Sequence, residues 1–333
     1  MKQLVILSGK GGTGKTSVTA AFAHLASLED SPVRAVLADA DVDAANLELV
    51  LAPRVLERQE FWGGKVAEID QGLCEGCGIC EQVCRFDAVW YAGKLGTGKL
   101  GNWETGNQST NIPTYQLTNL PAHQSTNIPV IDPIACDGCA ACVYQCPEEA
   151  ISMQEQMAGE WFRSESRYGP LFHAALIPAQ DNSGKLVTLV KQNARLLALD
   201  DAYDIVLVDG PPGIGCSVIS AASGADLALI VAEPTAAGVH DMHRVLQTTD
   251  HFGIQALICI NKADIFPQGA AKIEAFCQEE GIEMVGQIPF DLTVTEAMVQ
   301  GQTVAAFAPE APASQAIREI WVKVMDLLLG EPS

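Results

Sequence analysis

The chain lacks an apolar run long enough to cross a membrane. Among its 333 residues, no stretch approaches the roughly 18 consecutive apolar residues that indicate a membrane-spanning helix. A short apolar run at residues 4–7 is followed at once by a glycine-rich segment, so we expect a buried strand there and not a signal peptide. We therefore expect a cytoplasmic protein with no stable membrane association.

Positive charge is scarce as well. Lysine and arginine number 20 against 41 aspartates and glutamates, which gives a formal net charge of −21. Non-specific binding to nucleic acid or to an anionic membrane favours a basic surface. We therefore expect no nucleic-acid partner, and solubility is the simplest role for the acidity.

The absence of a secretory signal decides how the eleven cysteines are interpreted. In a secreted chain they would predict a disulfide framework. In a cytosolic chain, regular C-x-x-C spacing more often indicates metal binding.

What the sequence does contain is an alternation of apolar and helical segments. An apolar run at residues 3–8, a helical pattern at 15–28 and a second apolar run at 33–37 predict a βαβ unit with a parallel sheet. The pattern resumes at residue 204, and residues 314–329 have the spacing of an amphipathic helix packed on the sheet. The later predicted strands are residues 204–209, 225–232, 255–260 and 283–288.

An insert interrupts this alternation. Residues 61–157 are rich in Gly, Asn and Cys, and we predict a separate domain there between two parts of one α/β domain, 1–60 and 158–333. Within the insert, residues 108–131 repeat an eight-residue pattern three times with a proline in each copy, which excludes a helix. We favour a tandem duplication in a tolerant surface loop over the alternative of a partner-binding loop.

A phosphate-binding motif follows the first predicted strand. Residues 9–16 match G-x-x-x-x-G-K-[ST] directly before a helix. In such a loop, backbone N–H groups surround the phosphates, the lysine neutralises β/γ charge and the hydroxyl binds Mg²⁺. We therefore predict an ATP·Mg²⁺ site, with Lys15 and Thr16 in the last two roles. The other predicted members of this loop are Gly11, Gly12, Thr13, Gly14 and Ser17.

Aspartates end two of the predicted strands. Asp209 precedes a Gly-Pro-Pro-Gly turn, and we predict that it assists Mg²⁺ binding while the turn senses the nucleotide. Asp39 and Asp41 follow the second strand, and of these two we expect one to complete the magnesium shell and the other to orient water. Helix capping is the alternative, and we prefer it for Asp43.

Two cysteine runs share one spacing, C-x2-C-x2-C-x3-C. This spacing is typical of proteins with two [4Fe–4S] clusters, in which the last cysteine of each run binds the other run's cluster. Structural zinc is the alternative, but its ligands usually come as two separated pairs. The predicted ligands are Cys74, Cys77, Cys80 and Cys146 for one cluster, and Cys136, Cys139, Cys142 and Cys84 for the other.

The motifs of residues 1–58 and 160–329 resemble those of the MinD/ParA/Mrp group of P-loop ATPases, which includes the nitrogenase iron protein. The resemblance rests on residues 10–16, on Asp39-Ala40-Asp41 and on residues 209–213. It implies an ATP-bridged dimer in which Lys10 reaches the partner's phosphates and Asp41 positions the attacking water. It also implies that Asn261 reads the adenine, with Pro289 and the two residues after it lining the base.

The insert resembles a bacterial two-cluster ferredoxin, a small α+β domain. It departs from that pattern at Arg85, where a proline usually follows the first run, and in the 51 residues between the runs. Of the other cysteines, Cys259 and Cys277 are predicted in the core. A cysteine near the position of Cys216 binds a shared cluster in the nitrogenase iron protein, but no second cysteine completes such a site here, so we expect Cys216 to begin a helix.

Three functions fit these features. The first is an ATPase, acting as a homodimer or with a related ATPase, that couples ATP to electron transfer through two [4Fe–4S] clusters to a partner protein. The second, from another class, is an Mrp-like carrier that assembles or delivers a metal–sulfur cluster. The third is a MinD-like positioning ATPase, which the weakly basic C-terminal helix disfavours.

Overall fold

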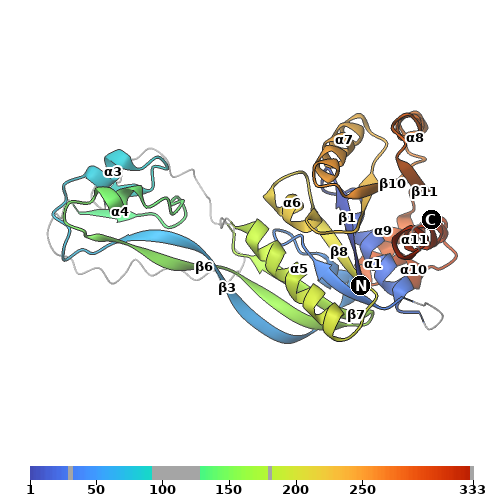
Figure 1. Cartoon of the computed structure of the whole chain (residues 1–333), viewed down its shortest axis with the longest axis horizontal. Helices are drawn as coiled ribbons and strands as arrows, with labels where there is room; N and C mark the ends of the chain where they lie inside the picture. The colour runs from blue at the N-terminus through green and yellow to red at the C-terminus, as the bar shows by residue number, and fades with distance from the viewer. Residues whose placement is uncertain (29–32, 92–127, 179–181, 331–333) are drawn as a thin grey trace. The chain divides into compact units, whose positions relative to one another are not determined.

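The computed structural model describes residues 1–28, 33–91, 128–178 and 182–330. The chain forms two compact units (Figure 1), one made of Met1–Gly63 with Met157–Ser333 and the other of Gly64–Gln156. We call them the α/β unit and the cysteine unit. In the described part of the chain, no helix is both long and apolar enough to span a membrane.

A nine-stranded sheet forms the α/β unit, in the order β11-β10-β9-β1-β8-β2-β7-β6-β3. Seven neighbouring strands are parallel, β7 pairs antiparallel with β6, and β3 lies at the edge. The prediction of a mostly parallel sheet flanked by helices is confirmed. The strands are β1 (Lys2–Ser8), β2 (Ala35–Asp39), β3 (Arg54–Ile69), β6 (Ile151–Ser166), β7 (Gly169–Leu176), β8 (Ile205–Pro212), β9 (Leu227–Ala232), β10 (Gln255–Asn261) and β11 (Glu283–Ile288).

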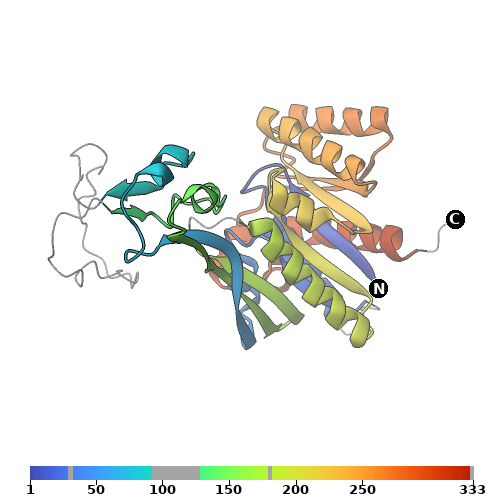
Figure 2. The same cartoon turned by 60° about the vertical axis from the view of Figure 1, so that its left-hand side comes forward.

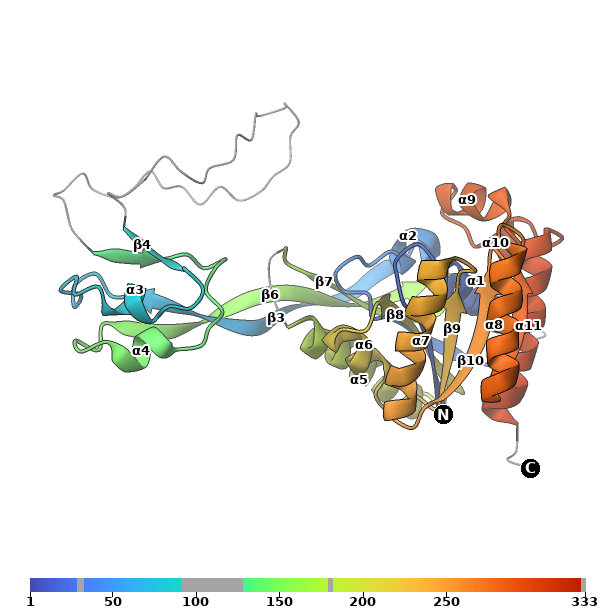
Figure 3. The same cartoon turned by 90° about the horizontal axis from the view of Figure 1, so that it is seen from above.

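Helices cover both faces of this sheet (Figure 2, Figure 3). Because side chains alternate along a strand, β1 sends Leu4 and Ile6 into one apolar core and Val5 and Leu7 into the other. One core holds side chains of α1 (Lys15–Ala26), α2 (Leu47–Leu51), α9 (Leu292–Val299), α10 (Val304–Phe307) and α11 (Pro312–Leu329). The other holds side chains of α5 (Ser183–Asp200), α6 (Cys216–Ala222), α7 (Ala236–His251) and α8 (Pro267–Glu280).

The C-terminal helix packs on the sheet, as predicted. In α11, Ile317, Ile320 and Val324 are buried, and the Trp321 ring meets Phe22 of α1 edge to face with centroids 5.0 Å apart. An aromatic pair of this kind adds to the stabilisation from burial alone.

Strands β3, β6 and β7, which form one side of the sheet with β3 at its edge, were not predicted. Most side chains of β3 are exposed, so the strand lacks the apolar run that marks the buried parallel strands. Its pairing with the sheet therefore left little signal in the sequence.

In its described residues, the cysteine unit contains two short helices and a small antiparallel sheet, joined to the ends of β3 and β6. The helices are α3 (Ile79–Val83) and α4 (Ala141–Gln145), and the sheet pairs β4 (Val89–Tyr91) with β5 (Pro129–Ile131). Of the octapeptide repeat, only residues 128–131 are described. The prediction that the repeat lengthens a surface loop therefore lies outside the described residues.

Candidate functional site

The phosphate-binding motif forms the turn between β1 and α1. Gly14 has φ 94° immediately before the helix begins at Lys15, and a Cβ at this position would collide with the Asn261 side chain. Glycine is therefore required there for both conformation and space. The first turn of α1 leaves backbone N–H groups free to bind an anion.

A cavity of about 610 Å³ lies against this turn. It is lined by Lys15 and Thr16, by Asp41 of the loop after β2, and by Pro211 and Pro212 of the predicted switch turn. The structure thus brings together segments that the sequence separates by up to two hundred residues. Gly11, Gly12, Gly14 and Ser17 also line it.

Asp209 is the centre of a buried hydrogen-bond group. Its Oδ2 accepts a hydrogen bond of 2.7 Å from Thr16 Oγ1, and its Oδ1 accepts one of 2.9 Å from Thr19 Oγ1. Burial raises the pKa of Asp209, while Lys15 and the two hydroxyls act in the opposite direction. Thr19 was missed by sequence reasoning, because its only signal is its place one turn of helix after Thr16.

Asp39 and Asp41 play different parts. Asp39 is fully buried and opposite Asp209 in the β2–β8 register, and its carboxylate accepts the backbone N–H groups of Asp41 and Leu47, each at 3.1 Å. Burial first, then the nearby Asp209, raises the pKa of Asp39 well above its usual range. Asp39 thus shapes the loop, while Asp41 lines the cavity.

The prediction that Asp43 caps a helix near residue 44 is wrong. The helix α2 begins at Leu47, with Asn46 as its N-cap, so Asp43 lies too early in the chain. The Leu47 N–H is bound by Asp39 instead, and Asp43 lines the cavity.

A second cavity, of about 180 Å³, lies beside the loop where the base was predicted. Asn261 and Pro289 both line it, with Phe290 and Asp291. The Asn261 amide nitrogen donates to Thr13 O at 2.7 Å, and its oxygen accepts the Lys262 N–H at 2.9 Å. Asn261 therefore holds the phosphate loop in this structure, and its role as an adenine reader stays a prediction.

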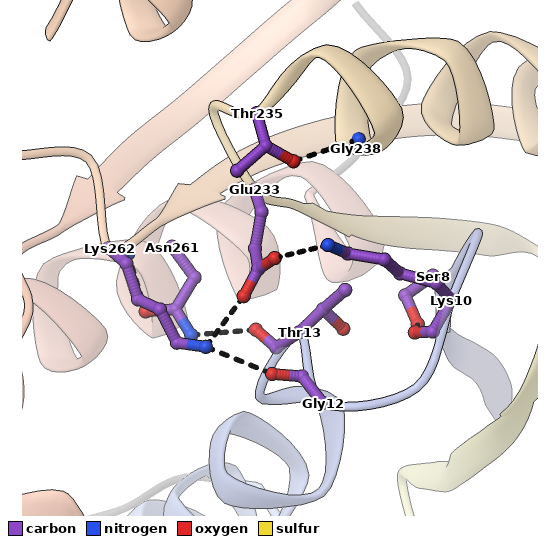
Figure 4. Close-up of polar contacts among 9 residues, drawn as sticks. All are labelled: Ser8, Lys10, Gly12, Thr13, Glu233, Thr235, Gly238, Asn261 and Lys262. Carbon is purple, nitrogen blue, oxygen red and sulfur yellow. Dashed lines mark hydrogen bonds and ion pairs between the residues drawn. The ribbon is translucent and has the colours of Figure 1, made fainter. Parts of the chain in front are cut away.

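Lys10 is held within its own chain. Its Nζ lies 2.7 Å from Oε2 of Glu233, whose other carboxylate oxygen lies 2.6 Å from Lys262 Nζ (Figure 4). Neither Glu233 nor Lys262 was singled out from the sequence, since no fixed spacing relates them to Lys10.

The two cysteine runs have the same local structure. Each begins after an aspartate whose carbonyl accepts the N–H of the first cysteine, Asp70 for Cys74 and Asp132 for Cys136. In each run the last cysteine follows a short helix, and its sulfur accepts a backbone N–H at 3.4 Å. These bonds run from Ala88 N–H to Cys84 and from Ala150 N–H to Cys146.

Backbone hydrogen bonds connect the two runs crosswise. Asp70 N–H donates to Ala150 O at 2.8 Å, and Asp132 N–H donates to Ala88 O at 2.7 Å. Each run therefore starts beside the end of the other. In keeping with this, one cavity is lined by Cys84 of the first run together with Cys136, Cys139 and Cys142 of the second. Cys74 and Cys80 of the first run pack in one apolar cluster with Cys136, Cys142 and Cys146 of the second, while Cys77 is exposed.

The three remaining cysteines lie as predicted in the α/β unit. Cys259 and Cys277 are buried, and burial raises the pKa of Cys259 to about 12, which makes it unreactive. Cys216 is the exposed first residue of α6.

Comparison with known proteins adds to this geometry. The family described as "CobQ/CobB/MinD/ParA nucleotide binding domain" matches residues 4–304. The chain is similar to the uncharacterized protein MJ0578 of Methanocaldococcus jannaschii, with 28% identity over 98% of this chain and 97% of that protein.

Other relatives match over a shorter length. The cytosolic Fe-S cluster assembly factor NBP35 of Eremothecium gossypii is 28% identical over 42% of this chain and 49% of its own. An iron-sulfur cluster carrier protein of Pyrococcus abyssi is 27% identical over 38% of this chain and 47% of its own. The chain therefore spans about half the length of these two relatives.

Among solved structures, the septum site-determining protein MinD of Pyrococcus horikoshii, in complex with Mg-ADP, is similar in fold. The TM-score is 0.51 at 18% identity, covering 98% of this chain and 96% of that one.

Proposed function

Because the chain belongs to the CobQ/CobB/MinD/ParA nucleotide-binding family, we propose that it is an ATPase that assembles or transfers iron–sulfur clusters. The observation that carries the proposal is the presence, in one chain, of a phosphate-loop cavity and of a cavity lined by four cysteines. The two partial relatives with named roles, an assembly factor and a carrier, favour this class of function over electron transfer.

The residues of the α/β unit suit Mg²⁺ and a nucleotide. Among the described residues, the buried Thr13 hydroxyl has no hydrogen-bond partner, and a phosphate oxygen would supply one. Thr16 and Asp209 would hold Mg²⁺, a hard cation that prefers oxygen ligands. Its positive charge would relieve the crowding of Asp39 and Asp209, whose pKa values are both raised.

The residues of the cysteine unit suit clusters with crossed ligands. Cys84 with Cys136, Cys139 and Cys142 would hold one [4Fe–4S] cluster around the shared cavity. Cys74, Cys77 and Cys80 would hold the other with Cys146, beside which the crosswise hydrogen bonds bring them. The N–H groups that reach Cys84 and Cys146 would stabilise the negative charge of thiolate ligands.

Zinc suits the same cysteines less well. A single zinc ion draws four ligands to within about 2.3 Å of one point, whereas each thiolate of a [4Fe–4S] cluster binds a different iron. Four cysteines within eleven residues, repeated in a second run, suit this demand better than the two separated ligand pairs usual for zinc.

Dimerisation is the proposed link between nucleotide and cargo. In a dimer that closes on ATP, Lys10 would contact phosphate, Asp41 would position water and the turn after Asp209 would move.

A second candidate function, electron transfer to a redox partner, is favoured by one observation. All eight proposed ligands are cysteines, which suits a cluster that is retained through turnover.

The experiment that tests the function begins with anaerobic purification and quantification of iron and sulfide. The reduced protein is then examined by EPR with and without Mg-ATP and incubated with an apo-acceptor ferredoxin. A Lys15→Ala variant, which loses its charge at the phosphate loop, serves as the control. We expect about eight irons per chain, and ATP-dependent transfer of iron to the acceptor that the variant does not perform.

Other outcomes decide between the candidates. Iron that stays on the chain while ATP changes the EPR signal or the potential would support electron transfer. A protein without iron, or with zinc in its place, would contradict both candidates.

A further inference from the structure

One carboxylate in the α/β unit binds two lysines at once. Glu233 follows β9 and is nearly buried, with 11% of its side chain exposed. Its Oε2 lies 2.7 Å from Lys10 Nζ and its Oε1 lies 2.6 Å from Lys262 Nζ. Figure 4 shows the two ammonium groups approaching the carboxylate from opposite sides.

The backbone that carries Glu233 is closely packed. The next helix, α7, begins with a hydrogen bond of 3.0 Å from Gly238 N–H to Thr235 Oγ1. A Cβ at Gly238 would collide with the carbonyl oxygen of Glu233, so the backbone between these two residues is tightly packed. Glu233 is therefore presented from a fixed position.

The loop opposite is held through its backbone. Ser8 Oγ donates to Lys10 O at 2.8 Å, and Lys262 Nζ donates to Gly12 O at 3.0 Å in addition to its contact with Glu233. The backbones that carry Lys10 and Glu233 are thus both held in place. The long Lys10 side chain can move away from Glu233 without a change in either backbone.

The charges at this point do not balance. One carboxylate faces two ammonium groups, so the group is one positive charge in excess before any anion binds. Burial tends to raise the pKa of Glu233, but its hydrogen bonds with Lys10 and Lys262 lower it below its usual range. If Lys10 left, Glu233 would still be paired with Lys262, so no buried charge would be stranded, which is the costly outcome.

We propose that Glu233 is a positioning residue that holds Lys10 inside its own subunit until a nucleotide phosphate replaces the carboxylate as its partner. Lys262 then neutralises Glu233 alone. This inference rests on the proposed nucleotide binding and is independent of the proposed clusters. It assigns to Glu233 and Lys262 opposite effects on nucleotide affinity, because one retains Lys10 and the other competes with Lys10 for the same carboxylate.

The test compares Glu233→Gln, Lys262→Met and their combinations with Lys10→Ala in the full-length protein. Dissociation constants for Mg-ADP and Mg-ATP are measured by calorimetry, and the dimer fraction by analytical ultracentrifugation. The control is Asp226→Asn, which alters an exposed ion pair with Lys2, 3.2 Å long, at the start of β1. Thermal unfolding checks that each variant is folded.

We expect Glu233→Gln to tighten nucleotide binding and Lys262→Met to weaken it, each by roughly five- to tenfold, the lower range of coupling between interacting groups. The effect of Glu233→Gln should vanish in the Lys10→Ala background, since it acts through that side chain. Lys262→Met should keep there only the part of its effect that comes from its lost hydrogen bond to Gly12 O. The dimer fraction of Glu233→Gln should depend less on ATP, and the control should match the natural protein.

Two results would overturn the inference. If Glu233→Gln weakens binding or leaves it unchanged, the carboxylate only supports the loop. If the effect of Glu233→Gln persists without Lys10, Glu233 acts by another route. A natural protein that binds neither Mg-ADP nor Mg-ATP would instead contradict the proposed function.

Discussion

Asp41 is the titratable group whose environment bears most directly on hydrolysis. It lines the phosphate-loop cavity, and burial raises its pKa to about 6, with Asp209 and Asp43 acting in the same direction and Lys15 in the opposite one. A carboxylate that positions or activates water must be ionised. If Asp41 positions water as proposed, its pKa would set the lower pH limit of ATP hydrolysis.

We expect kcat/KM for ATP hydrolysis to fall as the pH drops through about 6, the pKa of Asp41 in the free protein. The decrease should be about tenfold per unit below the pKa, because kcat/KM reports the free enzyme. The measurement is a pH–rate profile from pH 5 to 8. Asp43→Asn should keep the shape of the profile but move its midpoint to lower pH, because the Asp43 charge helps to raise the pKa of Asp41. If the residual activity of Asp41→Asn shows the same pH dependence as the natural protein, the assignment is contradicted.

Some site residues could be predicted and others could not, for a physical reason. Lys15 and Thr16 belong to one turn of chain, so their spacing is fixed and visible, and Asp209 is marked by its place at the end of an apolar strand. Glu233 and Lys262 meet Lys10 only after three strand ends come together in the sheet. The sequence contains no spacing that relates them.

The buried imidazole of His173, in β7, contacts both α2 and β6. His173 Nε2 lies 2.9 Å from Ser164 Oγ, and Nδ1 lies 3.1 Å from Glu48 Oε2. Although that carboxylate is close, burial lowers the pKa of His173 to about 4. The ring is therefore neutral at pH 7, with Nδ1–H donating to Glu48 and Nε2 accepting from Ser164.

This arrangement predicts a loss of stability in acid. The pKa of His173 is about 4 in the folded chain, against an ordinary value of 6.5. Between these two pH values the unfolded chain binds a proton at His173 that the folded chain does not bind. The stability is complete above pH 6.5 and declines as the pH falls toward 4. Between pH 7 and pH 5, this one group should remove roughly 2 kcal/mol.

Denaturant unfolding at pH 7 and pH 5 measures the effect. The decrease should be smaller by roughly 2 kcal/mol in His173→Gln, while His251→Gln, an exposed position, should keep it. An equal decrease in natural protein and His173→Gln would show that other groups cause the acid sensitivity.

Whether a strand could be predicted from the sequence depended largely on how much of its surface is buried. Strands in the middle of a parallel sheet are covered on both faces, so they have continuous apolar runs, and β1, β2, β8, β9 and β10 were predicted for this reason. β11, which was also predicted, lies at the edge of the sheet and is only partly buried. The exposed strand β3 carries no such run. Long-range pairing, and not local composition, determines where it lies.

The chain as a whole has separate apolar cores in its two units. Those of the α/β unit hold dozens of buried side chains, whereas the cysteine unit has a small cluster of Ala67, Ile69, Cys80 and Ile151 with partly buried neighbours. So small a core supplies little stability by itself. The cysteine unit should therefore depend on the proposed clusters to stay folded.

Replacing one ligand of each proposed cluster tests this independence. In a Cys74→Ser/Cys136→Ser variant, we expect loss of iron and of the unfolding transition of the cysteine unit. Nucleotide affinity and the transition of the α/β unit should remain, because the described core residues of the two units belong to separate apolar clusters. Calorimetry and nucleotide titration measure both. The double variant Cys259→Ala/Cys277→Ala, with one residue in each core of the α/β unit, should retain iron. Loss of nucleotide binding by the ligand variant would refute the independence.

The place of β8 in the sheet has a consequence for synthesis on the ribosome. β8 lies between β1 and β2 and pairs with both, so the first two strands have no common partner until residues 205–212 emerge. All of the cysteine unit, which ends at Gln156, is translated before that point. Domains generally fold as units while the chain grows. The cysteine unit can therefore fold before β8, the central strand of the α/β unit, has been synthesised.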